Sequence, residues 1–155
     1  MNEKCSEGLA VSRKNMRIAW RVDYGDCPER LEEGIVQIWM GDIEYHEGIP
    51  QLVNRKLILD KMDLSFATEP EPQNFRPPDE KELIFSSYGY QGCDVMVVSL
   101  ESGEVIYYSN APYQYDEPEG IYPDGSYMAF QMARTEDMAG VGYGIFIYDF
   151  TKATE

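Results

Sequence analysis

The sequence predicts an all-β fold, and three observations support this prediction. The 155 residues are rich in side chains that favour strands, with a hydrophobic fraction of 43%, twelve Tyr and six Phe. Thirteen Gly and nine Pro supply turns between short apolar runs. No segment of ten or more residues carries an apolar stripe of helical period. A chain of this length is expected to form one ordinary domain with its own core.

Apolar runs bounded by turn residues locate the individual elements. Residues 1–15 read as a polar, loosely held lead-in to a repeat domain over residues 16–155. Strands are expected at residues 16–22, 35–40, 51–59, 83–87, 94–100, 105–109, 127–132 and 144–150. Two acidic connectors, residues 63–79 and 110–120, carry prolines. Since proline cannot donate to a ladder, the first connector is not expected to form a central strand.

One segment recurs after 45 residues. Pro78-Asp79 aligns with Pro123-Asp124, and Phe85 aligns with Phe130, without a gap. Each copy has a Pro-Asp turn and then an apolar strand that ends in an aromatic residue. A fixed period of this size is typical of repeat architectures. We therefore predict that residues 78–85 and 123–130 are equivalent parts of adjacent sheets, stacked side by side about a common axis.

Aligning the strands yields about two and a half units. They cover about residues 16–60, 73–109 and 119–150, and the third stops before its last strand. A four-stranded unit of roughly 40–50 residues is what a β-propeller blade requires. The predicted fold is therefore an incomplete β-propeller built of four-stranded antiparallel blades. Glu80 stands where the later copy has Gly125, so that turn is expected to form without a residue of positive φ.

The repeat resembles the TolB-type repeat, a relative of the WD repeat. The similarity is carried by Pro123-Asp124-Gly125, Ala129-Phe130, the strand at 94–100 and the turn Ser102-Gly103-Glu104. The resemblance implies propellers of six or seven blades, commonly extracytoplasmic, that serve as protein-binding scaffolds or as accessory parts of peptidases and carbohydrate-processing enzymes. A closed ring needs at least about four blades. The chain is therefore expected to be part of a longer propeller, the interpretation we favour, or to self-associate through uncovered blade faces.

The charge restricts the classes of partner. Twenty-eight acidic and thirteen basic residues give a formal net charge of −15. This field repels phosphate backbones and anionic membranes, so no nucleic-acid partner is expected. It suits cationic partners, although it also serves simply to keep a strand-rich chain soluble. The sequence has no apolar run of signal or membrane-spanning length, so neither an export signal in this chain nor membrane insertion is expected.

Catalytic constellations are not evident in the sequence. His46 is the single histidine, which excludes multi-histidine metal sites within the chain. The sequence contains no Gly-x-Ser-x-Gly motif, phosphate loop or paired-cysteine site. The three cysteines are an odd count without metal-like spacing, and reduced thiols are expected. The chain is therefore predicted not to be an enzyme, and no catalytic residue is assigned.

An acidic run offers oxygen ligands of the kind that a hard cation such as Ca²⁺ prefers. Its members are Asp116, Glu117, Glu119 and the nearby Asp124. Their spacing matches no recognised calcium loop, and a solvated acidic connector is the plainer interpretation. No cofactor is therefore predicted, and calcium is kept as the one candidate metal.

Tyrosines in the expected loops are the candidate ligand-binding residues, because tyrosine supplies rigid contact area with a polar tip. These are Tyr88, Tyr90, Tyr113 and Tyr115. We expect Tyr107, Tyr108 and Tyr127, which lie within strands, to pack between blades, and Trp20, Trp39, Phe85 and Phe130 to lie in the core.

Two functions follow from this combination. The first is a non-catalytic propeller segment that binds a protein or peptide. The second is an accessory part of a carbohydrate-active enzyme or peptidase, with saccharide as a ligand and the catalytic residues outside this chain.

Overall fold

A computed structural model describes residues 6–23, 36–61, 64, 69–88, 93–109, 113–134 and 144–152. This part of the chain forms eleven strands and no α-helix. The strands are β1 (Ser6–Val11), β2 (Arg17–Asp23), β3 (Val36–His46), β4 (Ile49–Asp60), β5 (Glu69–Phe75), β6 (Glu82–Tyr88), β7 (Cys93–Ser99), β8 (Val105–Tyr107), β9 (Gln114–Ile121), β10 (Tyr127–Arg134) and β11 (Gly144–Asp149). The predicted all-β class is confirmed, and within the described ranges no helix could span a membrane.

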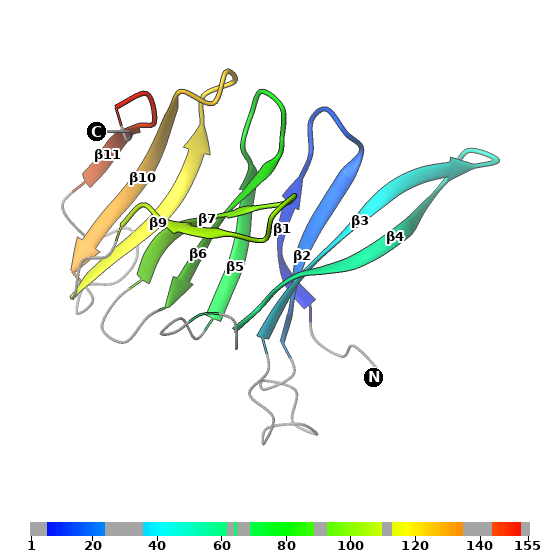
Figure 1. Cartoon of the computed structure of the whole chain (residues 1–155), viewed down its shortest axis with the longest axis horizontal. Coiled ribbons are helices and arrows are strands. Elements are labelled where there is room, and N and C mark those ends of the chain that lie inside the picture. The colour runs from blue at the N-terminus through cyan, green and yellow to red at the C-terminus, as the bar shows by residue number, and fades with distance from the viewer. Residues whose placement is uncertain are drawn as a thin grey trace.

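The strands follow one another as three antiparallel meanders (Figure 1). The first meander, β1 to β4, is a four-stranded sheet of its own. The second meander, β5 to β8, and the third, β9 to β11, belong to one seven-stranded sheet. A single parallel bridge between Cys93 and Tyr115 joins these two meanders. Strands β6 and β10, which carry the repeated motif, do not pair with each other. The prediction that they lie in two separate sheets was nevertheless wrong. The start of β9 pairs with the start of β7 through this single bridge, which joins the second and third meanders into one sheet.

All eight predicted strands are present, and one further strand begins each of the three meanders. β1 lies in the predicted lead-in, whereas β5 and β9 lie in the predicted connectors, so each meander begins earlier than its predicted unit. Pro70 and Pro72 fit within β5 because this strand pairs only with β6, so one of its edges needs no donors. β3 continues past Gly41, where an irregular register with β4 absorbs the expected break.

Alternate side chains of the second meander pack in opposite directions. Leu83 and Phe85 join a core cluster with Ile38 and Met40 of the first meander. Ile84, on the opposite face of the same strand, joins a cluster with residues of the third meander. Burying both faces explains the continuous apolar runs of β6 and β7. This alternation stacks the three meanders in chain order.

The predicted core aromatics divide into two groups. Phe85 and Trp20 are buried, as predicted, whereas Trp39 and Phe130 are half-buried and pack at the edges of their clusters. Of the strand tyrosines expected between sheets, Tyr108 packs against the cluster of the third meander. Tyr107 and Tyr127 are exposed instead. Tyr127 is exposed because it alternates with the inward-facing Met128. Tyr107 lies opposite Met96 but on β8, which pairs only with β7 and leaves the tyrosine at the margin of its meander.

Candidate functional site

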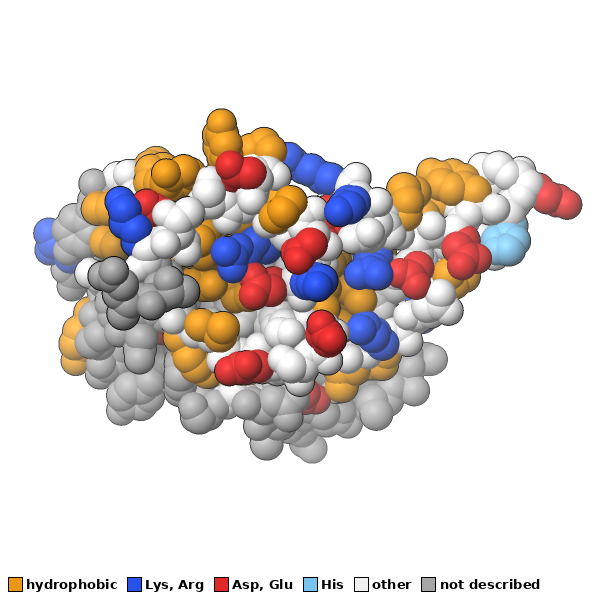
Figure 2. Space-filling view, turned by 45° about the horizontal axis from the view of Figure 1, so that its top comes forward, with side chains coloured by type: hydrophobic (Ala, Val, Ile, Leu, Met, Phe, Trp, Pro, Cys, Tyr) orange, Lys and Arg blue, Asp and Glu red, His pale blue; other side chains and the backbone are white. Residues whose placement is uncertain are grey.

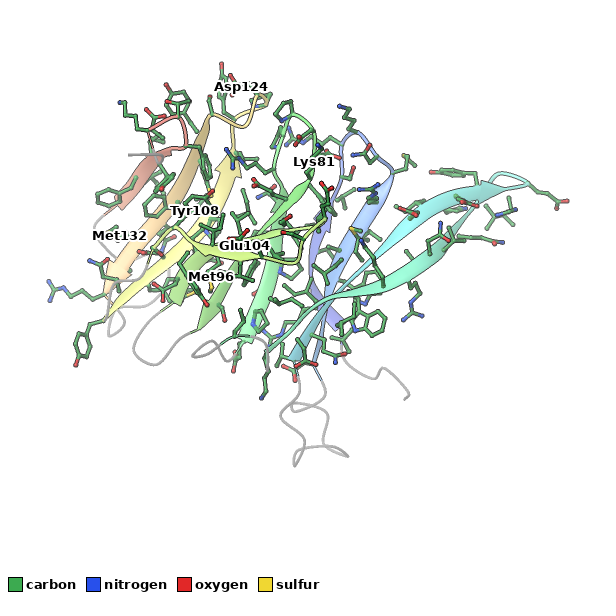
Figure 3. The ribbon with its side chains drawn as sticks, viewed as in Figure 1. Lys81, Met96, Glu104, Tyr108, Asp124 and Met132 are labelled. Atoms are coloured by element: carbon green, nitrogen blue, oxygen red, sulfur yellow. The ribbon has the colours of Figure 1, made fainter. Side chains whose placement is uncertain are left out.

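The turns between the first two strands of each meander gather at one end of the molecule (Figure 1). They are residues 12–16, 76–81 and 122–126, and the last two contain the repeated Pro-Asp pair. Lys81 and Asp124 mark the second and third turns at this end (Figure 3). We call the end of the molecule at which these three turns lie the turn end.

Glu80 joins the second turn to the first. Its side chain is buried at 4% exposure and accepts a short hydrogen bond from the Ser12 hydroxyl. The backbone amides of Arg13 and Lys14 donate to it at 2.9 and 3.2 Å, and the Asn15 side-chain amide donates at 3.0 Å. Burial raises the pKa of Glu80, but these hydrogen bonds outweigh it and hold the pKa below its ordinary value.

The backbone of Glu80 corrects one prediction. Its φ is 55°, so the second turn does contain a left-handed residue, although it is not glycine. Such a conformation costs a non-glycine residue roughly 1–2 kcal/mol. The hydrogen bonds from residues 12–15 fix the side chain and offset this cost. Glu80 and Gly125 therefore occupy equivalent positions in their turns, and both have a left-handed backbone conformation.

Gly125 joins the third turn to the second. Its φ is 77°, and a Cβ added to it would lie 1.8 Å from the carbonyl oxygen of Pro77. No side chain fits in that space, so glycine is required by both conformation and contact. Each turn therefore touches the one before it, by a buried carboxylate in one case and by backbone packing in the other.

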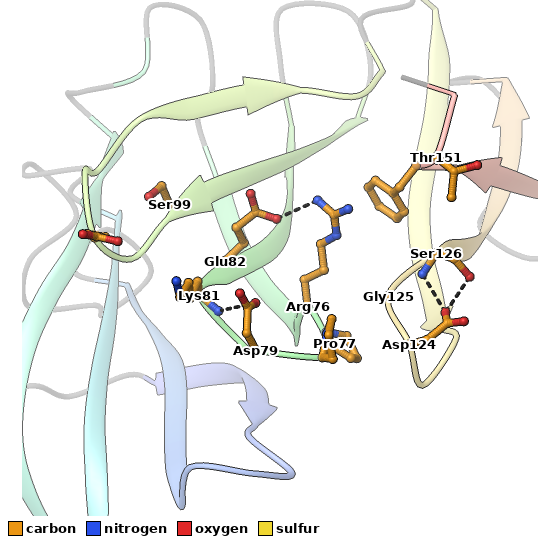
Figure 4. Close-up of a pocket in the computed structure, with 13 residues that line it drawn as sticks. Arg76, Pro77, Asp79, Lys81, Glu82, Ser99, Asp124, Gly125, Ser126 and Thr151 are labelled. Atoms are coloured by element: carbon orange, nitrogen blue, oxygen red, sulfur yellow. Dashed lines mark hydrogen bonds and ion pairs between the residues drawn. The ribbon is translucent and has the colours of Figure 1, made fainter. Parts of the chain in front are cut away.

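A groove of about 510 Å³ lies between the second and third turns (Figure 4). Arg76 crosses its floor, where its Nη1 lies 2.7 Å from Glu82 Oε2 and its guanidinium lies 4.1 Å from the centre of the Phe150 ring. Asp79 and Asp124 face the groove from equivalent positions of the two turns. Four acidic and two basic residues contribute to the lining: Asp79, Glu82, Glu101 and Asp124, with Arg76 and Lys81.

A second groove, of about 580 Å³, continues the first toward the first meander. Asp79, Lys81 and Glu101 line both grooves, so the two share one wall. Acidic and basic side chains are interspersed across the centre of this face, and hydrophobic side chains lie both on the projecting β3–β4 arm and at the opposite side (Figure 2). The grooves are therefore polar and of mixed charge, with more acidic than basic residues in the lining of each.

The predicted tyrosine site lies at the end of the molecule opposite the turn end. Tyr88 is the last residue of β6, and Tyr90 falls outside the described residues. Tyr113 immediately precedes β9 and is 64% exposed. Tyr115 is half-buried, and its hydroxyl lies 3.2 Å from Glu117 Oε2. The backbones of Tyr88 and Tyr115 both pair with Cys93, so the fold brings these two positions together.

The four acidic candidates do not come together. Asp116 is fully buried on β9, Glu119 is exposed on the same strand, and Asp124 lies at the turn end. Within the described ranges, no group of three or more His, Cys, Asp or Glu side chains could hold a metal. The Ser126 hydroxyl and amide lower the pKa of Asp124 by hydrogen bonding, which gives this carboxylate a structural role in its turn.

Asp116 is instead an unusual buried acid. Among the residues that the structure describes, neither carboxylate oxygen has a hydrogen-bond partner. Burial raises its pKa, the Ser109 hydroxyl nearby lowers it, and the charge of Asp94 raises it further, so the net direction is upward. Burying a carboxylate in this way disfavours its charged form.

Sequence reasoning missed Arg76 and Glu80. Neither belongs to a recognised motif, and the absence of glycine at position 80 was the only available signal. His46 is the last residue of β3, and its side chain is 57% exposed beside Glu44.

Comparisons with known proteins identify the fold. No protein-family model matches the sequence, and no curated protein matches it significantly. Among solved structures, the chain is similar to the crystal structure of TolB from Acinetobacter baumannii, with a TM-score of 0.58 and 19% sequence identity. The match covers 96% of this chain and 30% of that chain, so this chain spans less than a third of TolB. The resemblance predicted from the repeat is therefore confirmed at the level of fold: almost the whole chain is similar to a partial segment of TolB.

Proposed function

We propose that the chain is a non-catalytic segment of a TolB-like β-propeller that acts as a binding scaffold for a protein or peptide. In this proposal each meander is a blade, the first two with four strands and the third with three. The stacking of the meanders in chain order supports this assignment, as does the fold similarity to TolB. An extracytoplasmic location, without nucleic-acid binding or membrane insertion, belongs to the same proposal.

The observation that carries the proposal is the groove between the two Pro-Asp turns. Its charged groups are held by structural contacts: Arg76 by Glu82, Asp79 by the Lys81 amide at 3.3 Å, and Asp124 by the Ser126 amide at 2.8 Å. These contacts orient the groups for binding, because a side chain that is already fixed loses less conformational entropy when a partner binds. The excess of acidic residues and the net charge of −15 favour a partner segment that carries Lys or Arg.

The test is a selection of peptides from a random displayed library on the immobilised chain. Selected peptides should be enriched in Lys and Arg. Their affinity, measured by calorimetry, should fall at least about tenfold in the triple variant Asp79→Asn, Glu101→Gln, Asp124→Asn. The amide oxygens preserve the two turn hydrogen bonds, so the turns should remain folded.

A matched control removes the same charge elsewhere. Glu44→Gln, Glu104→Gln and Glu119→Gln change three exposed side chains outside both grooves. Equal weakening by the two triple variants would show that only the overall field matters and would refute a groove site. Binding to a glycan array that is lost in Tyr113→Ala would favour the accessory part of a carbohydrate-active enzyme instead.

A further inference from the structure

The second groove lies between the first and second meanders, and several of its charged groups already have partners. Arg17 Nε lies 3.3 Å from Asp42 Oδ1, and the side-chain amide of Asn54 donates to Asp42 Oδ2 at 2.9 Å. The Glu80 carboxylate accepts the hydrogen bonds from residues 12–15. These groups hold the walls of the groove in place, and their charges are balanced within the chain.

Two lysines in the same lining differ from these groups. Lys56 of β4 and Lys81 of the second turn are both exposed. Among the residues that the structure describes, no carboxylate forms an ion pair with either ammonium group. Lys56 lies opposite Met40 of the core cluster, so it extends the face of the first meander that packs on the second. The groove therefore receives one ammonium group from each of the two meanders.

The wall between the grooves separates acidic from basic positions. Asp79, Lys81 and Glu101 line both grooves, whereas Asp124 lines the first and Lys56 lines the second. A ligand that follows both grooves passes from the acidic side chains of the first to the two lysines of the second. The net charge of −15 repels a ligand that is only anionic. A carboxylate is therefore expected to bind at Lys56 only when the same ligand also carries a positive charge.

We propose that the two grooves bind one peptide segment that carries a basic residue and, at a fixed offset along the segment, an acidic residue. The basic side chain lies in the first groove, and the carboxylate lies in the second, at Lys56 and Lys81. This inference rests on the proposed peptide-binding function and specifies the partner of that site. Opposite charges at two positions also set the direction of the segment, because a reversed segment brings like charges together.

The test uses peptides selected on the immobilised chain and synthesised with amidated C-termini, so that a side chain is the only source of a carboxylate. The peptides should share an acidic residue at one offset from the basic residue. Changing this acid to its amide should weaken binding, measured by calorimetry, about fivefold, the upper range for an exposed ion pair. Lys56→Gln should weaken binding of the unchanged peptide equally, and both changes together should weaken it no more than either alone.

The matched control is Lys61→Gln, which removes one positive charge immediately after β4 and outside both grooves, and should leave the affinity unchanged. Peptides that are weakened by the acidic triple variant but not by Lys56→Gln would overturn this inference and leave the proposed function standing. Equal weakening by Lys56→Gln and Lys61→Gln would also overturn it, because the overall field would then explain the effect. A library that yields no binding peptide would refute the proposed function, and this inference with it.

Discussion

Glu80→Ala removes the carboxylate that links the first two meanders at the turn end. Four donors from residues 12–15 lose their acceptor. At about 1 kcal/mol net for each hydrogen bond, with an added cost for donors left buried, the free energy of unfolding should fall by about 3–5 kcal/mol. Glu80→Gly loses the same bonds but relieves the left-handed backbone, so it should be about 1 kcal/mol less harmful than alanine.

The assay is urea unfolding followed by tryptophan fluorescence, which reports on the first meander through Trp20 and Trp39. Glu104→Ala, at an exposed site, is the control and should change stability by less than about 0.5 kcal/mol. A loss of less than about 1 kcal/mol in Glu80→Ala would refute the role of the carboxylate as the link between the meanders.

The same side chain makes a prediction about pH. The pKa of Glu80 is lower in the folded than in the unfolded chain, so the unfolded chain binds more protons in acid. Its contribution is therefore complete above the ordinary value of 4.5 and is lost as the pH falls through the lower folded value. The stability difference between the wild type and Glu80→Gln should be constant near neutral pH and should shrink below about pH 4.5. A difference that grows in acid would contradict the assigned hydrogen bonds.

Three further predictions concern single buried groups. Gly125→Ala should lower the free energy of unfolding in urea by about 3 kcal/mol or more, because of the left-handed backbone and the clash with Pro77. The control, Gly103→Ala, has a φ of 76° and open space around it, and should lower the free energy of unfolding by only about 1 kcal/mol. Equal losses would argue against contact between the turns. Asp116→Asn should raise the melting temperature at pH 7 and leave it unchanged in strong acid, because a raised folded pKa means that stability is lost as pH rises; a lower melting temperature at pH 7 would contradict this. The Cys93 thiol should resist alkylation by iodoacetamide until the chain unfolds, and peptide mass mapping would measure this. The reason is that burial, and then the negative charges of Glu117, Asp94 and Asp116, raise the pKa of the thiol. Rapid labelling of the folded chain would refute its burial.

The apolar strands could be predicted from the sequence because their two-residue alternation and flanking turns are local signals. The first strand of each meander could not. β5 reads as Glu-Pro-Glu-Pro-Gln-Asn-Phe, a composition that local propensity assigns to a loop. It is a strand because β6 supplies its hydrogen-bond partners and neighbouring meanders bury Pro70 and Phe75. Tertiary context decided these elements.

The turn end was predicted only in part. The recurring Pro-Asp pair identified two equivalent turns, and the spacing of 45 residues placed them on neighbouring units. The groove between them depends on Arg76 lying across Phe150, a contact between residues far apart in sequence. No periodicity encodes such a pair. The candidate tyrosines were chosen for residue type in expected loops, and the fold places the described ones at the opposite end.

The prolines of β5 and β9 have a consequence for the behaviour of the chain in concentrated solution. An unprotected strand edge offers a row of amide donors on which fibrils can grow. Pro70, Pro72 and Pro118 interrupt that row in the opening strands of two meanders. A chain that repeats a sheet has several such edges. Proline residues in these strands disfavour pairing between the edges of different repeats, which is the first step toward cross-β aggregates.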